Sequence, residues 1–161
     1  SPLRTVEPYT VLAVIKASSI KSGVFASFWG VVGLVAAWVE ADGSNLFLKS
    51  RRNSPYGGDQ QFRGTTNLST SRHVIAYRYD GAGTLKLTVD GSTEELDDLG
   101  SVSVMQGGAG SSQLLMGWSD VGGTTRFHGD ISEIVVIPEA LSDDDVAGFR
   151  QYARDEWEGL P

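Results

Sequence analysis

The sequence predicts an all-β protein, built as an antiparallel sandwich of two sheets and closed by one short C-terminal α-helix. Short runs of alternating or wholly apolar residues recur along most of the 161 residues, and turn signals separate them. Glycine occurs 20 times, which favours tight turns between strands. Helical periodicity with a start signal is found at residues 143–156, so the helix is expected there.

The N-terminal part is predicted to supply buried strands. Residues 10–16 are apolar on both faces, which is typical of a central strand. Residues 23–39 carry no charge, and their length lies at the lower edge of the about 17–25 residues that a membrane helix needs. We reject a membrane span, because three glycines interrupt the run and an Asp42-Gly43 turn follows. Two or three buried strands are expected instead, followed by a strand at residues 45–50.

Residues 51–72 differ in character from both flanks. They are polar, rich in Gly, Ser, Thr and Asn, and they include four arginines. We expect a surface loop, interrupted at most by a short strand around residues 60–63. Long loops on a rigid sandwich are where binding residues concentrate.

A hairpin is predicted over residues 72–89, with a turn at 80–83. In its second strand Leu85, Leu87 and Val89 alternate with polar residues and should point inward. Asp90-Gly91 follows, a pair favoured in turns whose two central residues need positive φ. Residues 92–112 are acidic and then rich in Gly and Ser, with a short strand expected near Val102, and another strand is expected at residues 113–118.

Residues 127–137 are predicted to form a long strand in which side chains alternate without interruption. On that basis Ile131, Glu133, Val135 and Ile137 share one face and Ile134 and Val136 the other. Beyond residue 133 both faces are apolar, so burial on both sides is expected.

The helix that follows carries its own start signal. Ser142 and Asp145 form a variant of the capping box, and the acidic first turn suits the helix dipole. Val146, Phe149, Ala153 and Trp157 recur at three- and four-residue spacing. We therefore expect the helix to dock through one apolar stripe.

Four blocks of the chain carry a resemblance to a known family. Residues 72–91 read RHVIAYRYDGAGTLKLTVDG, and residues 127–157 read FHGDISEIVVIPEALSDDDVAGFRQYARDEW. Residues 9–15 and 113–118 complete the set. Taken in chain order, the four blocks resemble LamG-like jelly-roll modules of the concanavalin A-like lectin/glucanase superfamily. The resemblance implies a jelly-roll sandwich over a single domain, residues 1–161. Such modules are common in bacterial surface proteins and phage virion proteins.

Composition restricts the function. The formal net charge is −7, which disfavours binding to nucleic acid and to anionic membrane surfaces. Cysteine is absent, so the sequence has no disulfide, thiolate metal site or cysteine nucleophile. The first residues do not form a signal peptide, because no apolar core follows a basic start.

Catalysis by paired carboxylates is possible on this fold, since the related β-glucan hydrolases carry a Glu-x-Asp-x-Glu strand. The nearest match considered is Asp130-x-Ser132, with Glu133 on the opposite face, while residues 94–98 are expected in a turn with the wrong spacing. His73 and His128 lie in strands and are interpreted as structural. The chain is therefore expected not to be an enzyme.

Two kinds of binding site are considered. Calcium needs oxygen ligands, and among the loop carboxylates Asp59 and Asp120 are least explained by turn chemistry, whereas Asp42, Asp80 and Asp90 belong to turns. A sugar site needs an aromatic face beside planar polar groups. The candidate glycan-binding residues are Arg51, Arg52, Asn53, Tyr56, Asp59, Gln60, Arg63, Trp29 and Trp118.

We therefore expect a non-catalytic recognition module for a glycan or surface polysaccharide, in an extracellular or virion assembly. One alternative is a purely structural virion protein, such as a capsid decoration or tail-fibre domain. It would associate with copies of itself if part of the apolar run at residues 23–39 stayed exposed. A weaker alternative is a glycoside hydrolase or lyase with an unusual site.

Overall fold

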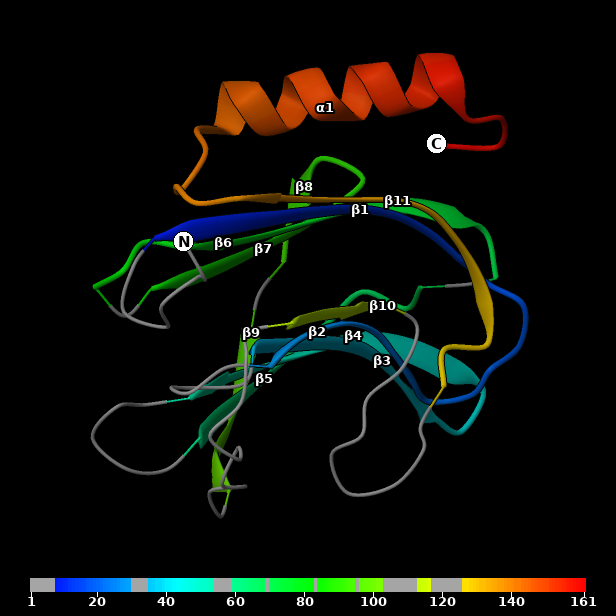
Figure 1. Ribbon diagram of the computed structural model, residues 1–161. Coiled ribbons are helices and arrows are strands. Elements are labelled where there is room, and N and C mark those ends of the chain that lie inside the picture. Colours follow the sequence, from blue (N-terminus) through cyan, green and yellow to red (C-terminus); the bar gives the residue numbers. More distant parts are fainter. Residues whose placement is uncertain are drawn as a thin grey trace.

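The computed structural model describes residues 8–29, 35–53, 59–68, 70–82, 84–94, 96–102, 113–116 and 126–161. Two antiparallel sheets face each other, and a helix lies over the outer face of one of them (Figure 1). The strand order is β11-β1-β6-β7-β8 in the five-stranded sheet and β10-β2-β3-β4-β5-β9 in the six-stranded sheet. This arrangement confirms the predicted sandwich with one C-terminal helix.

The bounds of the elements show how the chain crosses between the two sheets. The five-stranded sheet contains β1 (Tyr9–Ala17), β6 (Arg72–Tyr79), β7 (Leu85–Val89), β8 (Ser92–Thr93) and β11 (Gly129–Ile137). The six-stranded sheet contains β2 (Gly23–Trp29), β3 (Val35–Asp42), β4 (Asn45–Asn53), β5 (Asp59–Gly64), β9 (Leu96–Val102) and β10 (Gln113–Met116). The helix α1 spans Asp143–Glu156.

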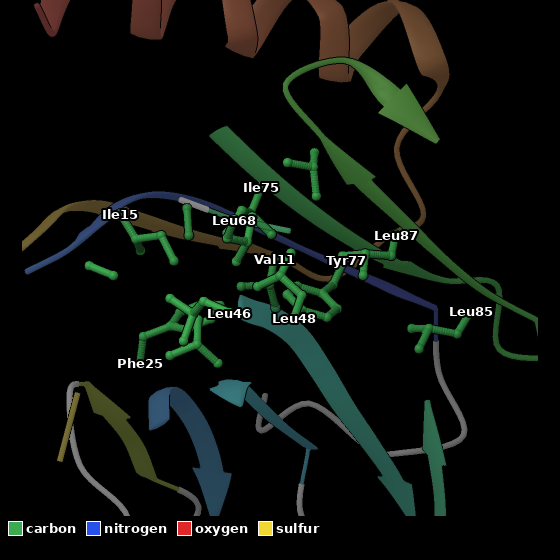
Figure 2. Close-up of a cluster of buried hydrophobic side chains, with 14 of the residues drawn as sticks. Val11, Ile15, Phe25, Leu46, Leu48, Leu68, Ile75, Tyr77, Leu85 and Leu87 are labelled. Atoms are coloured by element: carbon green, nitrogen blue, oxygen red, sulfur yellow. The ribbon is translucent and has the colours of Figure 1, made fainter. Parts of the chain in front are cut away.

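The main hydrophobic core fills the space between the sheets (Figure 2). Its side chains come from both layers, and each fully buried one contributes roughly 1.5–3 kcal/mol to folding. Tyr77 also crosses the layers, since its hydroxyl donates to the Lys49 carbonyl at 3.1 Å. The predicted inward residues of the second hairpin strand, Leu85, Leu87 and Val89, belong to this core. Other members are Val11, Ile15, Phe25, Val39, Leu46, Leu48 and Ile75.

The uninterrupted alternation expected along β11 is wrong. Against β1, Glu133 pairs with Val14 and Ile131 with Ile15, so Ser132 is an extra residue that bulges from the ladder. Ile131, Ile134 and Val136 consequently all pack against the core between the sheets, while Val135 and Ile137 pack under the helix. Both faces of this half of the strand are packed, as expected, although its residues are only partly buried.

The helix forms and docks as the sequence predicts. Ser142 accepts from the Asp145 backbone N–H, and the Asp145 side chain accepts from Ser142, which completes the capping box. Val146 and Phe149 pack on Leu12 and Ala76, and Ala153 and Trp157 pack with Val14 and Val74. The apolar stripe therefore faces the five-stranded sheet at β1 and β6. Figure 1 shows the helix lying over this sheet.

Of the apolar run, residues 23–29 form β2 and residues 35–39 form the first part of β3 in the six-stranded sheet, with Phe25 and Val39 buried in the core. The expectation of strands in place of a membrane span is confirmed. Among the described residues, no helix has the length and apolar character that crossing a bilayer requires.

The surface loop expected at residues 51–72 is only partly right. The short strand expected around residues 60–63 is present as β5, but Arg51, Arg52 and Asn53 extend β4 and are not loop residues, and residues 54–58 lie outside the described ranges. Leu68 is 1% exposed and belongs to the core. Polar composition misled the prediction, because these strands belong to a sheet with one face outside the sandwich, where polar residues are tolerated.

Residues 94–98 also depart from the expected turn. Leu96, Asp97 and Asp98 lie in β9, paired with β5. Glu94 is buried, and its carboxylate accepts from the Thr66 backbone N–H at 2.8 Å and the Thr66 hydroxyl at 2.6 Å. This carboxylate therefore holds the bend that follows β5.

The Asp90-Gly91 turn is confirmed, with φ of 50° and 87° at its two residues. Asp90 also accepts from the Val74 backbone N–H, and its carboxylate lies 2.7 Å from His73 Nδ1. His73, on β6, therefore contacts the turn, which agrees with its structural interpretation.

Candidate functional site

The candidate site is the outer face of the six-stranded sheet over β3, β4 and β5. Helix α1 lies over the outer face of the other sheet, whereas no described element lies over this one (Figure 1). Val39, Leu46 and Leu48 point into the core. Because side chains alternate along a strand, Phe47 and Lys49 point outward.

Arg63 on β5 and Asp42 on β3 are joined across β4. The Arg63 guanidinium lies over the Phe47 ring, with Cζ 3.9 Å from the ring centroid. From there its Nη2 donates to Asp42 Oδ2 at 2.9 Å. The ring thus supports the guanidinium from one side by a cation–π contact, and the carboxylate fixes its direction.

A second ion pair lies beside the first. Lys49 Nζ donates to Glu40 Oε1 at 2.7 Å, again linking β4 to β3. The Lys49 side chain is only 11% exposed although it belongs to the outer face. Neighbouring side chains therefore enclose it, and its ammonium group is held in one place.

The strand register places further polar positions next to these pairs. Lys49 is paired with Trp38 on β3 and with Arg63 on β5, and Arg63 is paired with Asp97 on β9. Two residues beyond Lys49 on β4, Arg51 is paired with Gln61 on β5. The face therefore presents rows of polar positions, with an aromatic residue at position 38.

The sequence-predicted residues fall into three groups. Arg63 and Arg51 belong to the outer-face positions just described. Trp29, Arg52, Asn53, Asp59 and Gln60 lie at one end of the same sheet, where β2 and β4 end and β5 begins. Tyr56, Trp118 and Asp120 lie outside the described residues.

The possible calcium site at Asp59 and Asp120 stays a prediction. Asp59 is placed at the start of β5, and Asp120 is outside the described ranges. Of the turn carboxylates, Asp42 is paired with Arg63 and Asp80 accepts from the Ala82 and Thr84 backbone N–H groups. The described part of the chain contains no group of three or more His, Asp and Glu side chains arranged to hold a metal ion.

Sequence reasoning missed Glu40, Asp42, Phe47 and Lys49. The signal was present, because Leu46 and Leu48 alternate with Phe47 and Lys49 in a strand that the sequence did predict. Glu40-x-Asp42 also matches the alternating carboxylates of the hydrolases better than Asp130-x-Ser132. Both carboxylates already hold a cation, so they act as positioned hydrogen-bond acceptors.

The other carboxylates considered for catalysis lie apart from this face. Asp130 is exposed on the edge strand β11, paired in register with Lys16. Glu133 lies under α1, where its carboxylate is 3.5 Å from the Trp157 indole Nε1.

Comparison with known families gives a match over most of the chain. A sequence profile of the family described as the concanavalin A-like lectin/glucanases superfamily matches residues 2–147. The comparison with curated protein sequences finds no match.

Several solved structures share the fold. The IT-sialidase CBM40 of Ruminococcus gnavus, bound to alpha2,3 sialyllactose, superposes with a TM-score of 0.67 at 16% identity, over 89% of this chain and 83% of that one. Domain 4 of AbnA, a GH43 extracellular arabinanase from Geobacillus stearothermophilus in complex with arabinotriose, superposes with a TM-score of 0.58 at 19% identity, over 90% of this chain and 67% of that one. The heptameric SAP-like pentraxin of Limulus polyphemus superposes with a TM-score of 0.60 at 18% identity, over 88% of this chain and 68% of that one.

Proposed function

The chain belongs to the concanavalin A-like lectin/glucanase superfamily, and from this membership we propose that it is a glycan-recognition module without catalytic activity. Its ligand binds on the outer face of the six-stranded sheet, across β3, β4 and β5. The residues that contact the sugar are Arg51, Lys49, Arg63, Glu40 and Asp42. Trp29, Arg52, Asn53, Asp59 and Gln60 extend the site toward one end of the sheet, and Tyr56 and Trp118 add aromatic faces.

The observation that supports this site is that two ion pairs, Lys49–Glu40 and Arg63–Asp42, lie side by side on a sheet face that no described element covers. Each pair offers a carboxylate acceptor next to a cationic donor. A sugar hydroxyl is itself both donor and acceptor, so one hydroxyl can bridge such a pair. Because the ion pairs and the Phe47 ring already fix the side chains, little conformational entropy is lost on binding.

The structures with the same fold support the ligand class. Two of those described above contain a bound oligosaccharide, sialyllactose in one and arabinotriose in the other. We propose that this chain likewise binds a glycan or surface polysaccharide outside the cell, as a module of a bacterial surface protein or of a phage virion. The self-association alternative would need exposed apolar residues within the run at 23–39. Phe25 and Val39 are buried in the core, so they do not contribute to such a surface, and the alternative stays a prediction for the rest of the run.

A glycan array read with and without a calcium chelator tests the proposal. Binding that is lost with chelator would place calcium in the site. On any glycan that binds, Arg63→Gln should weaken the affinity about tenfold or more, because a charge-assisted hydrogen bond is lost. Lys16→Gln, an exposed cation on the other sheet, is the matched control and should bind like the wild type. Equal affinities for both variants would exclude this face.

A further inference from the structure

A pocket on the opposite side of the molecule is not used by the proposed function. It has a volume of about 430 Å³ and lies between α1 and the β7–β8 hairpin. Arg78, Arg150, Arg154, Asp143, Thr88 and Thr93 contribute to its walls. Its volume falls within the roughly 300–1,000 Å³ that small-molecule sites span.

Arg78 forms the buried part of this pocket. It is 7% exposed, and its Nη1 is 2.6 Å from Asp143 Oδ1 and 3.2 Å from the Leu141 carbonyl. Its Nη2 donates to the Thr88 hydroxyl at 3.4 Å, while its buried Nε has no partner among the described residues. A buried guanidinium N–H without an acceptor is uncommon, because such donors are nearly always paired.

Arg150 repeats this pattern from the helix side. Its Nη2 donates to the Pro161 carbonyl at 3.4 Å, and its Nε is buried without a partner within the described ranges. Arg154, one helical turn further along α1, lines the same pocket. Three arginines therefore line the pocket, and the Nε donors of two of them, Arg78 and Arg150, are buried and unpaired within the described residues.

The charge of the pocket is opposite to that of the chain. Three arginines and one aspartate line it, which gives 3 − 1 = +2, whereas the whole chain carries −7. Asp143 is further engaged by Lys86 at 2.7 Å. The pocket is therefore a local cationic site on an acidic surface.

We propose that this pocket is a second binding site, which takes an oxyanion: a carboxylate, sulfate or phosphate group on a small molecule or sugar. The planar donor fork of arginine fits these groups in pairs of parallel hydrogen bonds. The inference is independent of the glycan site, because the pocket lies over the five-stranded sheet.

The melting temperature, measured at constant ionic strength in chloride, phosphate, sulfate, glucuronate and glucose, tests this site. A ligand that binds the folded state raises the melting temperature with concentration. We expect rises with the oxyanions and none with glucose. Phosphate and sulfate also stabilise proteins through exclusion from the surface. The decisive comparison is therefore with the Arg150→Gln/Arg154→Gln variant, in which calorimetric affinity should fall about tenfold or more.

The matched control is Lys21→Gln/Arg126→Gln, which removes the same charge at two exposed positions outside the pocket. A second variant, Ala147→Glu, places a carboxylate at the pocket wall and should abolish oxyanion binding. Binding of glucuronate but not of phosphate would assign the site to an acidic sugar. Binding of phosphate but not of glucuronate would assign it to a free anion. No saturable binding to the wild type, or equal binding to all variants, would overturn the proposal.

Discussion

Arg78 Nη1 lies 2.6 Å from Asp143 Oδ1, and this ion pair joins the five-stranded sheet to the first turn of α1. The arginine side chain is 8% exposed and the aspartate side chain 72% exposed, so the pair spans the boundary between the interior and the solvent. Hydrogen bonds from Lys86 and then from Arg78 hold the pKa of Asp143 below its ordinary value of 3.8. The ionised carboxylate therefore adds an electrostatic contact to the apolar packing that docks the helix.

Stability should respond to acid through Asp143. A carboxyl with a lowered folded-state pKa stabilises the fold fully above its unfolded value of 3.8 and loses that contribution as the pH falls through the lower folded value. Asp143→Asn should lower the melting temperature slightly at pH 7, because the carboxylate is largely exposed and solvent screens its ion pairs. The difference from the wild type should shrink as the pH falls below 3.8. Thermal unfolding followed from neutral to acidic pH measures both effects.

Asp144→Asn is the matched control, because Asp144 lies in the same helical turn and forms no ion pair within the described part of the chain. It loses only its interaction with the helix dipole, so its effect at pH 7 should be the smaller one. Equal effects of the two substitutions would argue against a role for the pair with Arg78.

Gly148 offers a stabilising substitution. It lies inside α1, and a Cβ built at this position meets no other atom within 4 Å. Gly148→Ala should raise the free energy of unfolding by about 0.5–1 kcal/mol, since alanine favours the helix and restricts the unfolded chain. Gly43→Ala is the contrasting variant, because its space is equally open but its φ is +62°. It should destabilise the fold by about 1 kcal/mol. Chemical denaturation measures whether the free energy of unfolding rises in Gly148→Ala and falls in Gly43→Ala.

The hydroxyl of Tyr77 should stabilise the sandwich by joining its layers. Tyr77→Phe removes the hydrogen bond to the Lys49 carbonyl, at a cost of about 0.5–1.5 kcal/mol. Burial raises the pKa of Tyr77 well above 10.0. Wild-type stability is therefore full below pH 10.0 and falls as the pH rises toward the folded value. Denaturation at pH 7 and above 10 should show a smaller alkaline loss in Tyr77→Phe than in the wild type.

The parts of the fold that sequence predicted are those determined by local chemistry. The capping residues Ser142 and Asp145, the Asp90-Gly91 turn and the alternating Leu85 and Leu87 each depend on neighbours within a few positions. The bulge at Ser132 could not be foreseen in this way. It is defined by the register of β11 against β1, and β1 is more than 100 residues away in sequence.

The candidate site was only partly predictable for a similar reason. Arg63 was identified from the polar character of its segment, but its partners Phe47 and Asp42 lie on two other strands. Their proximity depends on the order β3-β4-β5, which composition does not reveal. The arginine pocket was missed altogether, since Arg78 comes from a central strand and Arg150 from the helix that covers it.

The Phe47 ring should support sugar binding through Arg63 without touching the core. In a double-mutant cycle, Phe47→Leu and Arg63→Gln are made separately and together, and the free energy of unfolding of each variant is measured. The coupling energy in this free energy should be about 0.5–1 kcal/mol, from the cation–π contact. Phe47→Leu should also weaken glycan affinity, because the guanidinium loses the surface that holds it toward Asp42. In the Arg63→Gln background the same substitution should have little further effect on affinity. Additive losses of affinity in the two variants would mean that the ring contacts the ligand directly and does not act by positioning Arg63.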